Sequence, residues 1–351
     1  GEGLHEALRQ QNDTRCRIYA PVGAHRDLLA YLVRRLLENG ANSSFVNQVY
    51  DKKIPPSMIV TDPISEVMEL DHIANDKIPM PKDLFGEQRL NAKGWDITDP
   101  IEFAALDAAR SKFAGDHKWT FALDATLGEK GKVQKLVNPA NLQDEVGEIA
   151  NATPAAVTKA VEVSANGQKA WGSKAPSDRA AALRKAADLY EDHAAELFAL
   201  ASREAGKSLL DGIAEVREAV DFLRFYANEA ERLGEQDDVR GVIACISPWN
   251  FPLAIFTGQV AAALVAGNTV VAKPAEQSPL MGARAVELLH EAVVPKDALV
   301  LVPGAGDIGA ALTSQPNLGG VCFTGSTEVA KLIDKQLAKT ADSDSMLIAE
   351  T

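Results

Sequence analysis

Cysteine is scarce in this sequence, and no hydrophobic run is long. The chain has 351 residues and 3 cysteines, Cys16, Cys245 and Cys322, which stand far apart without a C-x-x-C pair. This spacing argues against a disulfide framework and a cysteine metal site, so we expect no bound metal and a reducing compartment. No apolar run approaches the roughly 20 residues that cross a bilayer, so we expect neither a spanning helix nor a signal peptide.

Positively charged residues are also fewer than negatively charged ones. Lysine and arginine together number 36 against 49 aspartates and glutamates, which gives a formal net charge of −13. An acidic surface repels phosphate backbones, so we expect no nucleic-acid binding by this segment. Hydrophobic residues make up 46% of the chain and charged residues 24%, an ordinary globular composition with enough length for two domains.

The sequence changes character along its length. Leucines recur at helical spacing from Asp27 to about Asn39, and prolines then punctuate residues 51–135. We therefore expect a helix, followed by an extended connection between two domains. Both ends of the sequence look cut, because residues 1–50 are too few for a closed domain and an apolar run stops at Thr351.

An α/β pattern begins at about residue 136. NPANLQDEVGEIA reads as a strand pair, and alanine-rich helices are expected at about 154–171, 177–204 and 208–232. Beyond Gly241, the strand-like runs GVIACIS, TVVAK, ALVLVPG and GGVCFTG each precede a helix, and MLIAE ends the series. Four strand–helix units in a row predict a parallel, doubly wound sheet that binds ligands at the carboxyl ends of its strands.

A rigid loop follows the first of these strands. It reads Ser247-Pro248-Trp249-Asn250-Phe251-Pro252, so two prolines and two aromatic residues surround one asparagine. A rigidly held carboxamide donor suits an oxyanion that develops on an attacked carbonyl group. A proline-shaped turn with a capping asparagine is the alternative interpretation.

Two further strand ends carry polar residues. Lys273 and Glu276, in VAKPAE, stand three residues apart and could bind ribose hydroxyls together, although a solvated charge pair is the alternative. Gly325 and Ser326, in FTGSTE, lie between a strand and a helix. Free N–H groups and the helix dipole at such a position favour a pyrophosphate.

Two other patterns receive a structural interpretation. Residues 304–309 spell G-x-G-x-x-G, the generic dinucleotide pattern. We interpret them mainly as a tight strand-to-helix turn, with a contact to adenine as the alternative, because Asp307 would point its charge toward phosphates. Cys245 and Cys322 lie in strand-like runs and are interpreted as buried, inert thiols rather than nucleophiles.

Taken in this order and spacing, residues 135–351 closely resemble the cofactor domain of the aldehyde dehydrogenase superfamily. The resemblance implies a Rossmann-like, doubly wound α/β domain that binds NAD. It also implies that Asn250 is an oxyanion-hole donor and Glu350 a general base. The residues that it assigns to cofactor binding are Ser247, Pro248, Trp249, Lys273, Glu276, Gly325 and Ser326.

Residues 15–50 resemble the last strand and helix of the (β/α)8 barrel of FAD-dependent proline dehydrogenase, through RIYAPVGAHRDLLAYLVRRLLENGAN. The resemblance implies that Arg34 and Arg35 grip the carboxylate of proline, that Tyr19 packs against the substrate ring, and that Glu38 lies near FAD. From the residues alone, two arginines near a helix end would complete the helix dipole. With the resemblance, bidentate carboxylate recognition is favoured.

Both families in this order imply a bifunctional enzyme. It would oxidise proline to pyrroline-5-carboxylate with FAD, and then glutamate semialdehyde to glutamate with NAD. We expect domains at 1–50, 51–135 and 136–351, a homo-oligomer and a cytoplasmic location, with a membrane quinone contact left open. Glu215 is a weaker candidate for contacting the second substrate, the alternative being a solvated helix face. The family's nucleophilic cysteine would follow Glu350 by a few dozen residues, so the chain as written is expected to be inactive.

Two other functions stay open on the sequence alone. A single-function aldehyde dehydrogenase with an unrelated N-terminal extension predicts no flavin and no effect of changing Arg34 or Arg35. A non-catalytic interaction module that kept the fold predicts a natural end near Thr351, although this would leave a sheet edge exposed.

Overall fold

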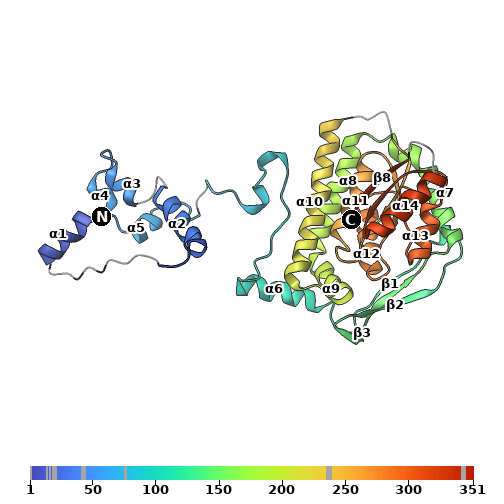
Figure 1. Cartoon of the computed structure of the whole chain (residues 1–351), viewed down its shortest axis with the longest axis horizontal. Coiled ribbons are helices and arrows are strands. Elements are labelled where there is room, and N and C mark those ends of the chain that lie inside the picture. Colours follow the sequence, from blue (N-terminus) through green and yellow to red (C-terminus); the bar gives the residue numbers. More distant parts are fainter. Residues whose placement is uncertain are drawn as a thin grey trace. The chain divides into compact units, whose positions relative to one another are not determined.

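The computed structural model describes all residues except 1, 13–14, 16, 18–21, 41–44, 75–76, 235–238 and 341–344. The chain divides into two compact units, Gly1–Ile78 and Pro79–Thr351 (Figure 1). None of the helices that the structure describes combines the length and apolarity needed to cross a bilayer.

The described part of the first unit is helical. Its helices are α1 (Glu2–Asn12), α2 (His25–Gly40), α3 (Phe45–Tyr50), α4 (Pro56–Ile59) and α5 (Pro63–Met68). The helix expected from the leucine spacing is confirmed as α2. Prolines that we expected to hold an extended connection instead open α4 and α5, because the fixed φ of proline suits the first turn of a helix.

The second unit contains both sheets. Its helices are α6 (Pro100–Ser111), α7 (Pro154–Gly172), α8 (Pro176–Asp192), α9 (Ala194–Ala205), α10 (Leu209–Leu233), α11 (Ala254–Val265), α12 (Pro279–Glu291), α13 (Gly306–Thr313) and α14 (Thr327–Thr340). Its strands are β1 (Trp119–Phe121), β2 (Val133–Asn138), β3 (Asn141–Ala150), β4 (Val242–Ile246), β5 (Thr269–Lys273), β6 (Leu299–Leu301), β7 (Leu318–Thr324) and β8 (Met346–Glu350).

The larger sheet has five parallel strands in the order β6-β5-β4-β7-β8. The strand order reverses between β4 and β7, since the chain first builds outward through β5 and β6 and then returns to the other side of β4. The predicted parallel, doubly wound sheet is therefore confirmed, and all five strand-like runs of the sequence form strands in it.

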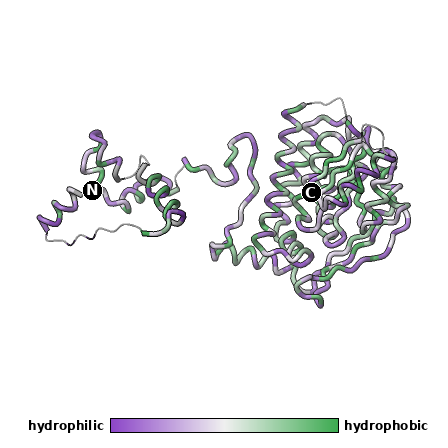
Figure 2. Tube along the Cα trace, viewed as in Figure 1, coloured by the Kyte–Doolittle hydropathy of each residue, from purple (hydrophilic) through white to green (hydrophobic). Residues whose placement is uncertain are grey.

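The sheet separates two hydrophobic clusters, because successive strand residues point to opposite faces. On β4, Ile243 and Cys245 belong to one cluster, and Val242, Ala244 and Ile246 belong to the other. Helices α8 to α12 cover the first face, and α7, α13 and α14 cover the second. Figure 2 shows that hydrophobic and hydrophilic residues alternate along the helices of the second unit.

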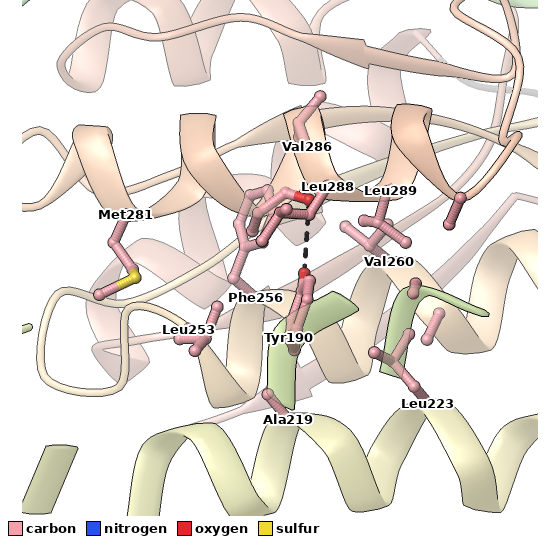
Figure 3. Packing of buried hydrophobic residues seen from close by; sticks show 14 of the residues in the cluster. Tyr190, Ala219, Leu223, Leu253, Phe256, Val260, Met281, Val286, Leu288 and Leu289 are labelled. Atoms are coloured by element: carbon pink, nitrogen blue, oxygen red, sulfur yellow. Dashed lines mark hydrogen bonds between the residues drawn. The ribbon is translucent and has the colours of Figure 1, made fainter. Parts of the chain in front are cut away.

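Tyr190, on α8, ties the helices of the first face together. Its buried hydroxyl donates a hydrogen bond to the Ala285 carbonyl oxygen of α12 at 3.4 Å, and lies 3.3 Å from Thr257 Oγ1 of α11. Figure 3 shows Tyr190 among Phe256, Leu223 and their hydrophobic neighbours. One polar group therefore fixes α8 against both helices that follow β4 and β5.

The helix predicted over 177–204 is two helices. His193 leaves helical geometry, with φ −94° and ψ 12°, so α8 ends at Asp192 and α9 begins at Ala194. The His193 ring lies 3.1 Å from Glu196, whose carboxylate pairs with Arg284 of α12 at 3.0 Å. The alanine-rich pattern continues through the break, which is why the sequence did not indicate it. The helices expected at 154–171 and 208–232 are confirmed as α7 and α10.

The smaller sheet has the order β1-β3-β2. The predicted strand pair is confirmed as β2 and β3, which are antiparallel, whereas β1 joins β3 in parallel. Leu106 of α6 and Trp119 of β1 are buried in the core of the second unit, although both fall in the expected connection 51–135. The domain boundaries at 1–50, 51–135 and 136–351 stay predictions.

Candidate active site

A cavity of about 1210 Å³ lies where the five strands of the larger sheet end. It is lined by residues that follow β4, β5 and β7, by the start of α13 after β6, and by Glu350 and Thr351 at the end of β8. In a doubly wound sheet, the point where the strand order reverses leaves a crevice outside the carboxyl ends of the strands. The predicted location of the site is therefore the location of this cavity.

The loop after β4 forms one wall of the cavity. Ser247, Pro248, Trp249, Asn250 and Phe251 all line it. Ser247 is buried, and its Oγ has no hydrogen-bond partner among the described atoms. Trp249 is 58% exposed, and Asn250 is exposed as well. The loop therefore offers one buried hydroxyl and one accessible carboxamide to a molecule in the cavity.

Lys273 and Glu276 lie beside this loop, after β5. The Ser247 N–H donates to the Lys273 carbonyl oxygen at 3.2 Å, which joins the two strand ends. The Lys273 side chain is buried. Its Nζ donates a hydrogen bond to the Pro274 carbonyl oxygen at 3.2 Å and lies 3.9 Å from the Glu276 carboxylate. Burial lowers the pKa of Lys273, whereas Glu276 and Asp307 oppose that shift. The alternative of a fully solvated charge pair is wrong for the lysine, because only Glu276 is substantially exposed.

The G-x-G-x-x-G segment forms a tight turn and also reaches the cavity. A Cβ on Gly304, whose φ is 157°, would lie 2.3 Å from Ile308 Cγ1, so the close turn requires glycine there. Gly306 and Gly309 line the cavity, and a Cβ on Gly309 would lie 3.6 Å from Lys273 Cε. The turn that we predicted is present, and two of its glycines contribute to the cavity wall.

The turn after β7 forms the opposite wall. The Gly325 N–H donates to the Glu350 carbonyl oxygen at 3.1 Å, which ties this turn to the end of β8. Ser326 Oγ accepts a hydrogen bond from the Val329 N–H at 3.3 Å at the start of α14. Gly325, Ser326 and Glu350 all line the cavity, and the Glu350 residue is exposed.

The sequence did not identify three residues that shape this region. Gln259, on α11, donates to Thr324 Oγ1 at 3.0 Å and so holds the turn after β7. Burial raises the pKa of Glu218, on α10, and the nearby carboxylates of Glu215 and Glu350 raise it further. Lys207 opposes that shift, and it lies in the short turn between α9 and α10. No local pattern distinguishes Gln259 and Glu218 from ordinary helix residues, or Lys207 from an ordinary turn residue.

Glu215 does not lie on a solvated helix face, so that alternative is wrong. Its residue is 1% exposed, and its Oε2 accepts hydrogen bonds from the Leu253 N–H at 3.1 Å and the Ala254 N–H at 2.9 Å. Its other oxygen lies 2.9 Å from Lys207 Nζ. Oε2 is thus satisfied by two hydrogen bonds, whereas Oε1 has the ion pair but no hydrogen bond among the described atoms. Glu215 does not line the cavity.

The two described cysteines lie away from the cavity lining. Cys245 and Cys322 are register partners on β4 and β7, with Cys245 buried and Cys322 half-buried. The hydrogen bond with Cys322, together with burial, raises the pKa of the Cys245 thiol. Cys16 lies outside the described residues. Within the described part of the chain, no group of three or more histidine, cysteine, aspartate or glutamate residues could hold a metal ion.

The residues predicted in the first unit are only partly described. Arg34 and Arg35 lie on α2, are exposed, and place their guanidinium groups 6.0 Å and 5.3 Å from the Tyr31 ring centroid. Tyr19 and the side chain of Glu38 lie outside the described residues. The described residues of this unit therefore do not test the flavin and proline assignments.

Comparison with known proteins agrees with this geometry. The sequence model of the aldehyde dehydrogenase family matches residues 126–347, which is more than half of the chain. The chain belongs to the aldehyde dehydrogenase family. The model of proline dehydrogenase matches residues 1–48, so the alternative of an unrelated extension before the aldehyde dehydrogenase part is wrong.

Individual relatives match nearly the whole chain. The chain is 47% identical to "Bifunctional protein PutA" of Klebsiella aerogenes, over 96% of this chain and 26% of that protein. A crystal structure of bifunctional proline utilization A matches with a TM-score of 0.81 and 44% identity, over 100% of this chain and 34% of that one. The predicted resemblance to this bifunctional protein is therefore confirmed. The chain spans about a quarter of the length of the curated relatives that it matches first.

A second kind of solved structure is also similar. The 1-pyrroline-5-carboxylate dehydrogenase from Thermus, solved with bound NAD, matches with a TM-score of 0.70 and 30% identity. The match covers 74% of this chain and 55% of that one. The Rossmann-like fold of aldehyde dehydrogenase type is thus confirmed by the sheet topology and by this structural likeness.

Proposed function

We propose that this chain is the coenzyme-binding part of a longer enzyme that oxidises proline to glutamate. The observation that carries the proposal is the single cavity that gathers Asn250, Lys273, Glu276, Gly325 and Glu350 at the ends of adjacent strands. The match of residues 1–48 to the proline dehydrogenase model is a second observation that supports the proposal. The two oxidations would be proline to pyrroline-5-carboxylate with FAD, and glutamate semialdehyde to glutamate with NAD.

The residues around the cavity fit NAD. The cavity volume of about 1210 Å³ suits a ligand longer than the drug-sized molecules that occupy pockets of roughly 300–1,000 Å³. The buried Ser247 Oγ lacks a partner among the described atoms, and Lys273 and Glu276 offer a donor and an acceptor for ribose hydroxyls. The N-terminus of α14, beyond Gly325 and Ser326, offers a favourable dipole for the pyrophosphate.

Each residue would have a distinct task in the aldehyde step. Bound NAD supplies a hydride acceptor. Asn250 would donate its carboxamide N–H to the oxygen that gains negative charge when the aldehyde carbon is attacked. Glu350 would take a proton from the water that releases glutamate. Since neither described cysteine lines the cavity, the attacking thiol would come from another part of the longer protein.

The coenzyme assignment can be tested on this chain alone by isothermal titration with NAD. Glu276→Gln is expected to weaken binding about tenfold, because one charge-assisted hydrogen bond contributes roughly 1.5–3 kcal/mol. Glu291→Gln, on the exposed end of α12, is the matched control and is expected to bind as the unchanged chain does. Absence of NAD binding by the unchanged chain would refute the assignment.

The reaction assignment is tested on the longer protein, by following NADH and glutamate formation from proline. Asn250→Ala is expected to lower kcat of the aldehyde step by about 10²–10³-fold, the usual effect of removing one oxyanion donor. Asn317→Ala, an exposed turn position, serves as the control. Unchanged aldehyde turnover in Asn250→Ala would remove the oxyanion role.

The proline step is tested in the same protein with an artificial electron acceptor. Arg34→Met and Arg35→Met are each expected to raise KM for proline, because a guanidinium pairs with a carboxylate in two parallel hydrogen bonds. The aldehyde step, measured separately with NAD, is expected to stay unchanged. A proline KM equal to that of the unchanged protein would refute the assignment of these arginines.

In the cell, we propose that the longer protein is a cytoplasmic homo-oligomer with a peripheral contact to membrane quinone.

A further inference from the structure

Two buried glutamates cap the N-termini of α11 and α12, the helices that follow the loops after β4 and β5. Glu204, at the end of α9, accepts hydrogen bonds from the Leu280 and Met281 N–H groups of α12 at 2.7 Å and 2.9 Å. Glu215, on α10, accepts from the first N–H groups of α11 in the same way. The first N–H groups of a helix have no partner within the helix, so a buried oxygen acceptor at the helix N-terminus satisfies them.

The two caps differ in one respect. The Glu215 carboxylate pairs with Lys207 at 2.9 Å, and both side chains are largely buried, with exposures of 1% and 13%. The Lys207 ammonium also lies 4.4 Å from the centroid of the Phe251 ring. An ammonium over an aromatic face is attracted by the ring, more strongly when it is shielded from water.

These contacts meet on the loop that carries Asn250. Phe251 follows Asn250 directly, and Leu253 and Ala254, whose N–H groups bind Glu215, lie three and four residues after it. Proline at 248 and 252 limits the backbone freedom in between. Lys207 and Glu215 do not line the cavity themselves.

We propose that Lys207 and Glu215 act together as positioning residues that fix the Asn250 loop in its reactive orientation. The pair grips the far end of the loop through two backbone N–H groups and one aromatic ring. The role of the loop in aldehyde oxidation rests on the proposed function, whereas the contacts themselves do not. In this proposal Glu215 acts through the loop and does not contact the substrate itself.

Removing the lysine has a specific physical consequence. Without Lys207, the carboxylate of Glu215 remains buried with two N–H donors but without its counter-charge, which is costly in a low-dielectric interior. Phe251 loses its ammonium contact at the same time. The loop is then free to shift, and a shift of about 1 Å in a reacting group can cost roughly 10²-fold in rate.

The contacts are tested first in this chain, by amide hydrogen exchange at single-residue resolution. Lys207→Met is expected to raise exchange at Leu253 and Ala254 about tenfold or more, with Leu280 and Met281 unchanged. Glu204→Gln is the matched control, because it alters the equivalent cap of α12, and its effect is expected at Leu280 and Met281 alone. Lys207→Arg is expected to restore protection.

The exchange result can overturn the proposal without any enzyme activity. Unchanged exchange at Leu253 and Ala254 in Lys207→Met, or an equal rise at Leu280 and Met281, would show that the pair does not hold the loop. If Lys207→Met does not fold, exchange at Leu253 and Ala254 is measured in Glu215→Gln instead. That variant keeps one acceptor oxygen but loses the charge.

The catalytic consequence is then measured in the longer protein. Lys207→Met is expected to lower kcat of the aldehyde step about 10–100-fold, with KM for NAD nearly unchanged and with rescue by Lys207→Arg. A parallel loss of NAD affinity and kcat, or no loss of kcat, would contradict a positioning role. If the unchanged longer protein oxidises no aldehyde, the proposed function fails while the exchange result still decides the contact.

Discussion

At the scale of single residues, burial changes the pKa of two ionisable side chains, Glu204 and Lys273. The Glu204 carboxylate is fully buried, and burial raises its pKa to about 8, although the Leu280 and Met281 N–H groups lower it. Burial shifts Lys273 the other way, lowering the pKa of its ammonium. Both shifts follow from one cause, because a low-dielectric interior disfavours the charged form of each group.

Glu204 gives a prediction about stability and pH. Its folded pKa of about 8 lies above the ordinary glutamate pKa of 4.5, so the folded state holds the proton more tightly than the unfolded state. The resulting stabilisation is complete below about pH 4.5 and is lost as the pH rises through 8, by up to about 1.4 kcal/mol per pH unit. Glu204→Gln, which cannot ionise, is expected to flatten this slope in urea unfolding from pH 5 to 9.

The control for that measurement is Glu291→Gln, an exposed substitution on α12 that should keep the slope of the unchanged protein. An identical slope in Glu204→Gln would mean that this carboxyl does not titrate in the range. Any other ionising group would then have to account for the dependence.

At the scale of elements, close backbone contacts fix the smaller sheet. Gly147, on β3, faces Trp119 of β1, and a Cβ at this position would lie 2.0 Å from the Trp119 carbonyl oxygen. Backbone cannot move aside as a flexible side chain can. We therefore expect Gly147→Ala to separate β1 from β3 and to lower the free energy of unfolding by about 1–3 kcal/mol.

This prediction is checked by urea denaturation against Gly94→Ala, because a Cβ on Gly94 meets nothing within 4 Å. Equal stability of the two variants would show that β1 does not need the close approach. Loss of stability in Gly147→Ala alone is the expected result.

The elements also show which features the sequence could predict. All five strands of the larger sheet were predictable from their apolar runs. The central strands β4 and β5 are buried on both faces, as such runs predict, whereas β8 is an apolar run whose last three residues are exposed. The break at His193 was not, since alanine-rich helices look alike on either side of it. The cap that Glu215 provides was not predictable either, because its N–H partners lie 38 and 39 residues away in sequence. Local patterns identify the loops, whereas contacts between distant helices decide how the loops are held.

At the scale of the whole molecule, the chain joins two families but spans only about a quarter of its curated relatives. We expect the isolated chain to bind NAD and yet to form no NADH from glutamate semialdehyde, because neither described cysteine lines the cavity. The measurement is absorbance at 340 nm, with the longer protein as the positive control. Turnover by the isolated chain would show that the thiol is not required from elsewhere.

Five separate strands present the five segments that surround the cavity. Each segment is presented by its own strand, and a helix follows each of the segments after β4, β5, β6 and β7. A lineage could alter the segment after β5 to change its preference for the adenosine end of a coenzyme while the oxyanion segment after β4 stayed intact. A designer could therefore exchange one segment at a time. The N–H groups that Glu215 and Glu204 bind, at the starts of α11 and α12, mark where the segments after β4 and β5 should end.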